Sequence, residues 1–463
     1  MQTTHGTRTS TMASRTTTIR TTTNGSGLCG FLNEPVHCPG ENISGLCILL
    51  NTIMQMQLEL FPNKISAPVQ SLTVPPSGGI IPIAELFEAY QSCRRNKRNT
   101  TNALAFELDY EHNLVELLEE INNRTYNPGK SIAFIVDKPV KREIFAADFR
   151  DRIVHHLLIN KINLFFEKEF IFDSYACRAG KGTHLGIRRI DRFIRKCSKN
   201  YIRDCYVLKM DIKGFFMSID RSILYQRLES FLSKKYTLQD YEIVLDLCRK
   251  IIFYDPAHNC SIKGYHSDWD SLPADKSLFH SRPGCGLPIG NLTSQVFANF
   301  YLNSFDHFMK HSVGLCYYGR YVDDIVIVHQ NHAYLTTLIS VAGDYLQREL
   351  GLKLHNRKTC LKHYIYGVKF LGAIIKPHRI YIANRTKGNF YNTIQKFNAV
   401  AQDHKPNRTE LAAFRSSINS YLGIMKHYST YRLRRHLIFK FLSKWWWNAV
   451  KFNYKIEKAI IKK

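Results

Sequence analysis

Three aspartates stand at the ends of segments that resemble β-strands, and their spacing suits metal-assisted chemistry. Asp211 ends the alternating run 207–211, and Asp323 and Asp324 lie between two β-rich runs, which predicts a hairpin with the pair at its tip. Adjacent acids in an apolar run are costly unless cations neutralise them. If the two segments are neighbouring strands, the carboxylates could bridge two Mg²⁺ ions about 3.5–4 Å apart, which suits phosphoryl transfer.

The type of metal follows from the donor atoms. Carboxylate oxygens are hard ligands that favour Mg²⁺, with Mn²⁺ as a substitute, over zinc. The 12 cysteines form no CxxC pair and no Cys/His cluster at zinc spacing, so we expect buried thiols in a reducing compartment. An alternative for Asp323 and Asp324 alone is a turn exposed to solvent, because an aromatic-x-Asp-Asp tetrapeptide is a weak signal.

The charge of the chain indicates a polyanionic partner. Sixty-four Lys and Arg against 38 Asp and Glu give +26, which argues against an ordinary acidic metabolic enzyme. Residues 351–463 hold 24 of the basic residues and three acids, and aromatic residues alternate with them. This composition predicts a nucleic-acid-binding region, and the alternative is a basic helical face in contact with solvent.

The elements that must position these residues fall into several regions of the 463-residue chain. Residues 1–27 contain eleven Thr and no acid and are expected to be a flexible arm, and 28–100 form an N-terminal extension of unknown role. Helical and strand signals alternate over 101–379, with a long loop-like insertion at about 254–286, and 380–463 is basic and helical. No apolar run reaches the length of a membrane helix and no signal-peptide core is evident, so we expect an intracellular protein without a membrane partner.

Several motifs occur in an order that resembles reverse transcriptases. Asp211 is followed five residues later by Phe216, and Asp323 and Asp324 come after Tyr321 and Val322. Between them lies a motif that is similar to the one in diversity-generating retroelement reverse transcriptases and related bacterial defence enzymes: Gly286-Leu287-Pro288-Ile289-Gly290-Asn291-Leu292-Thr293-Ser294-Gln295. The resemblance covers about residues 132–372. It implies an α+β right-hand polymerase architecture, with fingers and palm of antiparallel sheet plus helices, a helical thumb, and a preceding N-terminal extension.

The resemblance implies roles for the residues around the acids. Asp211, Asp323 and Asp324 would bind the two metal ions, with the backbone carbonyl of Ile212 as a further ligand. Phe216 would lie under the sugar of the incoming nucleotide and exclude a 2′-hydroxyl, although a core aromatic residue is the alternative. Lys358 would be the general acid for the leaving pyrophosphate, and a Lys exposed to solvent is the alternative.

It also implies contacts to the nucleotide and to nucleic acid. Lys141 and Arg142 suit a triphosphate because they offer charge and, for Arg, a planar fork. Ile289, Gly290 and Gln295 would contact the nucleotide, and Ile289 replaces a Gln of retroviral relatives, so we expect low copying fidelity. The residues expected to contact nucleic acid are Arg178, Lys181 and Gly182 in a second fingers motif, Phe370, Leu371 and Gly372 in a primer grip, and Arg432, Arg434 and Arg435 in the thumb.

Together these expectations describe an RNA-directed DNA polymerase that adds dNTPs to a primer. Its partners would be a template RNA, expected to be a dedicated non-coding RNA, the DNA product, dNTPs, and an accessory protein or a second copy of the chain. The setting would be the bacterial cytoplasm, in antiphage defence or a diversity-generating element. We expect system-specific partners at residues 1–100 and around Trp269. The alternative is a catalytically degenerate RNA-binding scaffold with a polymerase fold.

Overall fold

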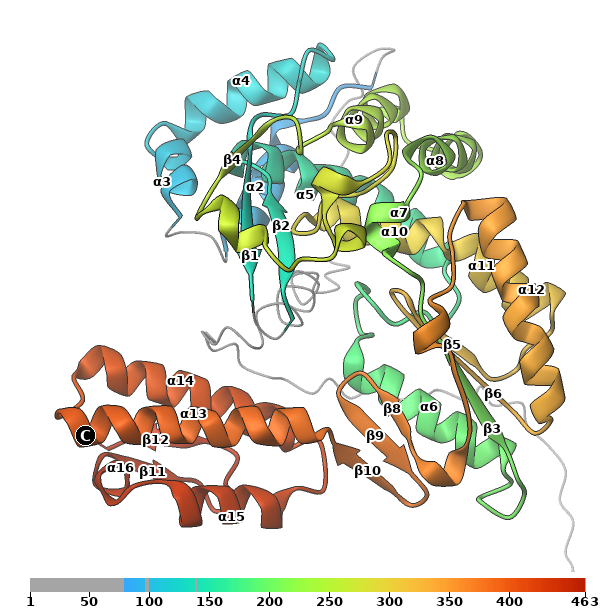
Figure 1. The fold of residues 1–463 in the computed structure, drawn as a ribbon. Helices are drawn as coiled ribbons and strands as arrows, with labels where there is room; N and C mark the ends of the chain where they lie inside the picture. The colour runs from blue at the N-terminus through green and yellow to red at the C-terminus, as the bar shows by residue number, and fades with distance from the viewer. Residues whose placement is uncertain (1–78, 96–99, 138–139, 463) are drawn as a thin grey trace, which may run out of the picture. The chain divides into compact units, whose positions relative to one another are not determined.

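A computed structural model describes residues 79–95, 100–137 and 140–462 (Figure 1). The predicted Thr-rich arm over 1–27 and most of the predicted extension over 28–100 lie outside the described residues. In the part of the chain that the structure describes, no helix is both long and apolar enough to cross a membrane.

The first described region is a group of helices next to a small sheet. Helices α2 (Ile83–Arg94) and α3 (Thr101–Glu107) pack with the long helix α5 (Phe149–Glu169), and α4 (Tyr110–Asn122) packs with α2 and α3. Strands β1 (Ser131–Val136) and β2 (Arg142–Ala146) are antiparallel, and β4 (Cys260–Ile262) adds to β1 in parallel. The insertion therefore contributes a strand to the sheet that carries Arg142.

A second, four-stranded sheet carries the predicted acids. Its order is β5-β6-β3-β7, all antiparallel, with β3 (Tyr206–Met210), β5 (Tyr318–Tyr321), β6 (Asp324–His329) and β7 (Cys360–His363). Helices α6 (Thr183–Cys197) and α12 (His332–Leu350) pack against it. The predicted strand before Asp211 and the predicted hairpin at Asp323–Asp324 are both present.

Further helices connect the two sheets. These are α7 (Phe215–Ser218), α8 (Arg221–Lys235), α9 (Tyr241–Phe253), α10 (Leu292–Tyr301) and α11 (Asn303–His307), which a π-helical turn, Phe308–Ser312, extends. The insertion forms three short 3-10 helices: η1 (His266–Trp269), η2 (Ala274–Lys276) and η3 (Leu278–His280). Two more, η5 (Asn356–Lys358) and η6 (Tyr364–Tyr366), flank β7.

The C-terminal region is helical, as the sequence predicts, but it also contains strands. A three-stranded antiparallel sheet of β8 (Val368–Phe370), β9 (Ala373–Lys376) and β10 (Arg379–Ile382) precedes α13 (Asn384–Asp403), α14 (Arg408–Met425), α15 (Tyr431–Phe441) and α16 (Lys444–Ala449). The hairpin of β11 (Val450–Phe452) and β12 (Ala459–Ile461) follows. The fold class is thus α+β, as expected, with sheets that are antiparallel except for the parallel pair of β1 and β4 and with a helical C-terminal region.

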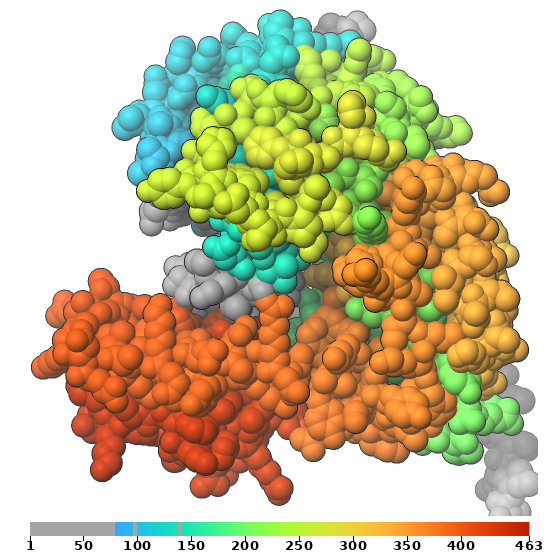
Figure 2. All heavy atoms as spheres, in the orientation of Figure 1, coloured from blue at the N-terminus to red at the C-terminus, as the bar shows by residue number. Residues whose placement is uncertain are grey.

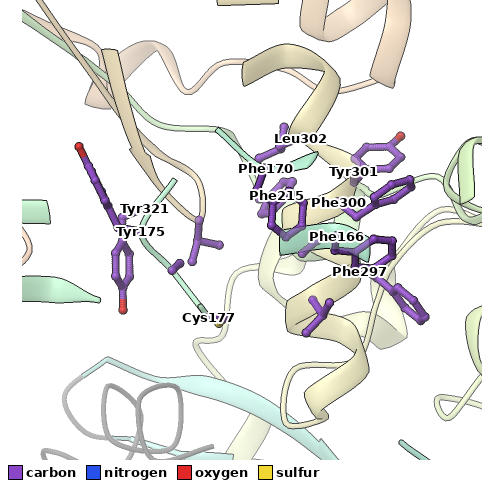
Figure 3. Close-up of a cluster of buried hydrophobic side chains, with 14 of the residues drawn as sticks. Phe166, Phe170, Tyr175, Cys177, Phe215, Phe297, Phe300, Tyr301, Leu302 and Tyr321 are labelled. Carbon is purple, nitrogen blue, oxygen red and sulfur yellow. The ribbon is translucent and has the colours of Figure 1, made fainter. Parts of the chain in front are cut away.

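Aromatic side chains fill the main core behind the four-stranded sheet. Figure 3 shows Phe297, Phe300 and Tyr301 of α10 near Phe166 of α5, and the rings of Phe166 and Phe300 stack with their centroids 4.7 Å apart. Phe297, Tyr301 and Phe305 are almost fully buried. The aromatic residues that follow the 287–295 loop are therefore part of the core.

A fully buried ion pair lies beneath the hairpin of β5 and β6. The guanidinium of Arg320 donates to both carboxylate oxygens of Asp306, at 2.7 and 2.6 Å, and neither side chain has any exposed surface. Tyr318 donates to the same carboxylate. Arg320 also donates to the backbone carbonyl of Val322 at 2.9 Å, so the pair holds the turn that carries Asp323.

We expect Asp306→Asn to lower the free energy of unfolding of the main core by about 3 kcal/mol, because Arg320 would keep a buried charge without a counter-charge. Urea unfolding followed by circular dichroism measures this. The control is Arg348→Gln, which removes an exposed ion pair with Glu349 and should leave the unfolding midpoint unchanged. Equal midpoints for Asp306→Asn and the parent would contradict the structural role of the pair.

Candidate active site

Sheet pairing brings the three predicted acids to one end of neighbouring strands. Asp211 directly follows β3, and β3 pairs with β6 so that Met210 lies opposite Ile325. Asp323 lies in the turn between β5 and β6, and Asp324 begins β6. Val322 in that turn has a φ of 54°, which is unfavourable for a β-branched residue and is held by the bond from Arg320.

The three carboxylates interact through their charges. Asp211 is buried, and Asp323 and Asp324 are half-buried. Loss of solvent is the main cause that raises the pKa of Asp323, and the negative charges of Asp324 and Asp211 add to it. Together they raise this pKa to about 7. This repulsion means that the acids need positive charge nearby to remain ionised together.

Two lysines supply positive charge in the structure. Lys358 Nζ donates to Asp211 Oδ1 at 2.9 Å, and Lys209 Nζ lies 2.8 Å from Asp324 Oδ1. Burial alone would lower the pKa of Lys358, but the hydrogen bond to Asp211 and the neighbouring carboxylates outweigh it and raise the pKa. The sequence reasoning missed Lys209, although its place two residues before Asp211 puts both side chains on one face of the strand.

The donor set suits a hard divalent cation. Among the described residues no three His, Cys, Asp or Glu side chains are close enough together to hold a metal ion as they stand. The two lysine ammonium groups occupy carboxylate oxygens of Asp211 and Asp324, so a metal would have to replace them there. Three mutually repelling carboxylates with hard oxygens nonetheless fit Mg²⁺ better than any softer ion.

A cleft of about 1300 Å³ opens above the acids and contains most residues expected to bind the nucleotide. Its lining includes the three acids, Ile212 and Lys358, together with Lys141, Arg142, Phe216, Ile289, Gly290, Gln295, Leu371 and Gly372. The cleft therefore unites, in one cavity, residues that are up to 231 positions apart in the sequence, from Lys141 to Gly372.

The loop at 287–291 is fixed against strand β2. Phe145 donates its backbone N–H to the carbonyl of Ile289 at 2.9 Å. Gly290 has a φ of 129°, and a Cβ there would lie 2.8 Å from the carbonyl oxygen of Phe145. Only glycine fits this position, which explains why the loop can lie so close to the fingers strand.

Phe216 and Gln295 both line the cleft but differ in burial. Phe216 is half-buried and packs edge-on to the buried Phe215, with ring centroids 5.4 Å apart. Gln295 is buried at the start of α10, where its Oε1 accepts a hydrogen bond from the thiol of Cys177 at 3.2 Å. The part of Gln295 that lines the cleft is thus held by a protein contact.

Three residues expected to contact nucleic acid have buried side chains that contact other parts of the protein. Arg178 pairs with Glu167 and donates to the carbonyls of Ile171 and Ser174, so it fixes its own loop. Phe370 lies in the core, whereas Leu371 and Gly372 beside it reach the cleft. Arg434 donates to the carbonyl of Ile456 at 2.7 Å.

Of the other residues expected to contact nucleic acid, Lys181 has partners within the protein, whereas Arg432 and Arg435 are exposed. Lys181 donates to the carbonyl of Phe172, and its Nζ lies 3.3 Å from the centre of the Phe172 ring. Gly182 is buried and has a φ of 105° before helix α6. Arg432 and Arg435 are exposed and line a hollow on α15 of about 600 Å³ with Tyr431, His436, Phe439 and Lys440.

Several aromatics expected to contact nucleic acid are core residues of the C-terminal region. Trp446 has no exposed surface and stacks on Phe414 with ring centroids 3.8 Å apart. Phe390 is also fully buried and packs with Tyr421 at 5.2 Å. These rings are therefore not exposed for contact with a nucleic acid.

The family model described as reverse transcriptase (RNA-dependent DNA polymerase) matches residues 138–375, just over half of the chain. The search of curated proteins found no match. Among solved structures, telomerase from Candida albicans in complex with a TWJ fragment of telomeric RNA is similar with a TM-score of 0.39 and 12% identity, over 72% of this chain and 61% of that chain. Apo telomerase from Candida tropicalis has a TM-score of 0.42 and 12% identity, over 68% and 57%. The chain thus spans about three fifths of the length of these telomerase chains.

We expect replacement of Arg432 and Arg435 by Ser to weaken binding of a template–primer duplex and to reduce the slope of log Kd against log salt by about 1 to 2, because up to two phosphate contacts are lost. Fluorescence anisotropy over a series of salt concentrations measures both quantities. As a control, Lys234→Ser with Lys235→Ser removes the same charge from the exposed end of α8 and should leave the slope unchanged. Equal slopes for the α15 variant and the parent would show that this face does not bind the duplex.

Proposed function

The chain belongs to the reverse transcriptase family, and on that premise we propose that it is an RNA-directed DNA polymerase that adds dNTPs to a primer 3′ end. The observation that carries the proposal is the convergence of Asp211, Asp323 and Asp324 below a cleft that also contains Lys141 and Arg142. All five residues lie within the matched region. Carboxylates and cations in one cleft are what phosphoryl transfer requires.

The residues of the cleft divide the work of catalysis. Asp211, Asp323, Asp324 and the carbonyl of Ile212 would hold two Mg²⁺ ions, which supply positive charge to the reacting oxygens when bound. Lys141 and Arg142 neutralise the triphosphate, and Ile289, Gly290 and Gln295 shape the nucleotide pocket. Lys358, whose ammonium donates to Asp211 Oδ1 at 2.9 Å, would supply the proton to the leaving pyrophosphate.

The biological setting is a further part of the proposal. The motif from Gly286 to Gln295 supports a bacterial enzyme of the diversity-generating or defence-associated type, which copies a dedicated non-coding RNA in the cytoplasm. An accessory protein or a second copy of the chain would complete the system. A degenerate RNA-binding scaffold is disfavoured because all three acids and both cations, Lys141 and Arg142, share the cleft.

We expect Asp323→Asn to reduce incorporation of dNTPs on the order of a thousandfold, because a neutral amide cannot replace the carboxylate charge. Primer extension on an RNA template measures the rate, and anisotropy should show unchanged template–primer binding. Asp344→Asn on the exposed face of α12 is the matched control and should keep full activity. An active Asp323→Asn enzyme would exclude the proposed catalytic role.

We expect Phe216→Ala to lower the preference for dNTPs over rNTPs by at least about tenfold, because the ring that excludes a 2′-hydroxyl is removed. The ratio of kcat/KM for a dNTP and its matching rNTP gives the preference. Phe216→Tyr keeps the ring and should keep the preference. If Phe216→Ala discriminates as well as the parent, Phe216 is a packing residue beside Phe215 and not a sugar gate.

A further inference from the structure

The insertion between α9 and α10 contributes to the cleft, which also contains Lys141 and Arg142, the residues expected to bind the triphosphate. Strand β4 pairs with β1 of the fingers sheet, and Lys263 immediately after it donates its backbone N–H to the carbonyl of Ala133 at 2.8 Å. Figure 2 shows this segment, coloured yellow-green, at the surface next to β1 and β2 in teal. The segment at 263–280, called the cap here, is therefore part of the fingers surface.

A buried carboxylate fastens the cap to strand β2. Glu143 has no exposed surface, and its Oε1 accepts hydrogen bonds from the Trp269 indole and the Ser277 hydroxyl, both at 2.7 Å. The backbone N–H of Leu278 donates to its other oxygen. Three donors from the cap satisfy one carboxylate, so detaching the cap would break all three hydrogen bonds.

The cap also packs against the residues that follow the first catalytic acid. A Cβ on Gly214, three residues after Asp211, would lie 2.6 Å from the carbonyl oxygen of Asp275. Leu278 shares a small hydrophobic cluster with Phe145 and Met217, and Trp269, Phe216 and Ile289 pack against this cluster. The cap is thus in contact with the wall expected to hold the sugar and base.

Cations of the cap face the same cavity. Lys263 and Lys276 are exposed side chains that line the cleft with Lys141 and Arg142, and Asp275 is the acid that the cap adds to this lining. The Nζ of Lys141 donates to the carbonyl of Asp270 at 2.6 Å, so the cap also holds one of the expected triphosphate ligands. The whole cleft is lined by six Lys or Arg side chains and four Asp, and the two cap lysines add to the positive charge that suits a polyphosphate.

We propose that the cap is part of the nucleotide site, where Lys263 and Lys276 bind the triphosphate of the incoming nucleotide and Glu143 is the positioning residue that holds the cap in place. This inference rests on the proposed polymerase function. A triphosphate is favoured over the template backbone because the cap packs on Gly214 and on the Phe216 cluster, which adjoin Asp211. Neither Lys263 nor Lys276 is part of the sequence motifs on which the resemblance to reverse transcriptases rests.

The first experiment replaces Lys263 and Lys276 by Ala in the full chain. We expect the KM for dTTP on an RNA template with a DNA primer to rise at least about tenfold with kcat unchanged, because each lost charged contact weakens ground-state and transition-state binding equally. The Kd of the template–primer should stay constant. The control is Lys234→Ala with Lys235→Ala, which removes the same charge from α8 outside the cleft.

Two outcomes of this experiment overturn the proposal. One is a weaker template–primer Kd with an unchanged KM for dTTP, which would assign the lysines to nucleic acid. The other is no change in either quantity. Equilibrium binding of dTTP to the parent and to the double variant separates this inference from the proposed function: a parent that binds dTTP without polymerising overturns the polymerase alone, whereas equal dTTP affinities of the two proteins overturn the role of the lysines.

The second experiment tests the positioning role of Glu143. We expect Glu143→Ala to raise the KM for dTTP and to expose the cap to limited proteolysis, while Glu143→Gln, which keeps an acceptor for Trp269 and Ser277, has a smaller effect. Combined with Lys263→Ala and Lys276→Ala, Glu143→Ala should raise KM little further, because a displaced cap no longer presents its lysines. Fully additive effects on KM, or a resistant cap in Glu143→Ala, would show that Glu143 does not act through the cap.

Discussion

Mutual repulsion of three carboxylates is the constraint on which the centre of the structure depends. Asp211, Asp323 and Asp324 can lie together only because neighbouring strands force them together and because positive charge lies beside them. Lys209 and Lys358 provide that charge from two different segments. The protein thus carries its own counter-ions, and a metal must compete with ammonium groups instead of entering a bare acidic site.

The buried ion pair of Arg320 and Asp306 holds the turn at Asp323 in place. Arg320 donates hydrogen bonds to Asp306 and to the carbonyl of Val322. These bonds fix Val322, which has a strained backbone and directly precedes Asp323. A buried ion pair is costly to form, but its planar, two-bond geometry allows only one arrangement. The position of Asp323 therefore depends on Arg320 and Asp306, neither of which lines the cleft.

The sequence predicts the features that depend on local pattern. Alternating residues before Asp211 and on both sides of Asp323 indicate strands, and these are the strands that bring the acids together. The sequence does not predict the binding partner of a basic side chain. Arg178 and Arg434 would look the same in a sequence if they bound phosphates, but here they donate to protein carbonyls. The cap was not predictable as a part of the cleft, since its attachment depends on Glu143, which is 126 residues from Trp269. A lone Glu in a fingers strand gives no sign of a partner so distant in the chain.

The C-terminal helices have a hydrophobic core of their own. Phe390, Phe414, Ile418 and Trp446 belong to it, and Tyr428 is half-buried against both this core and the main one. A chain with two cores of this kind is expected to unfold in two cooperative steps, so that no single unfolding temperature describes it. Damage to the smaller core would then leave molecules whose cleft is intact but whose C-terminal helices have melted.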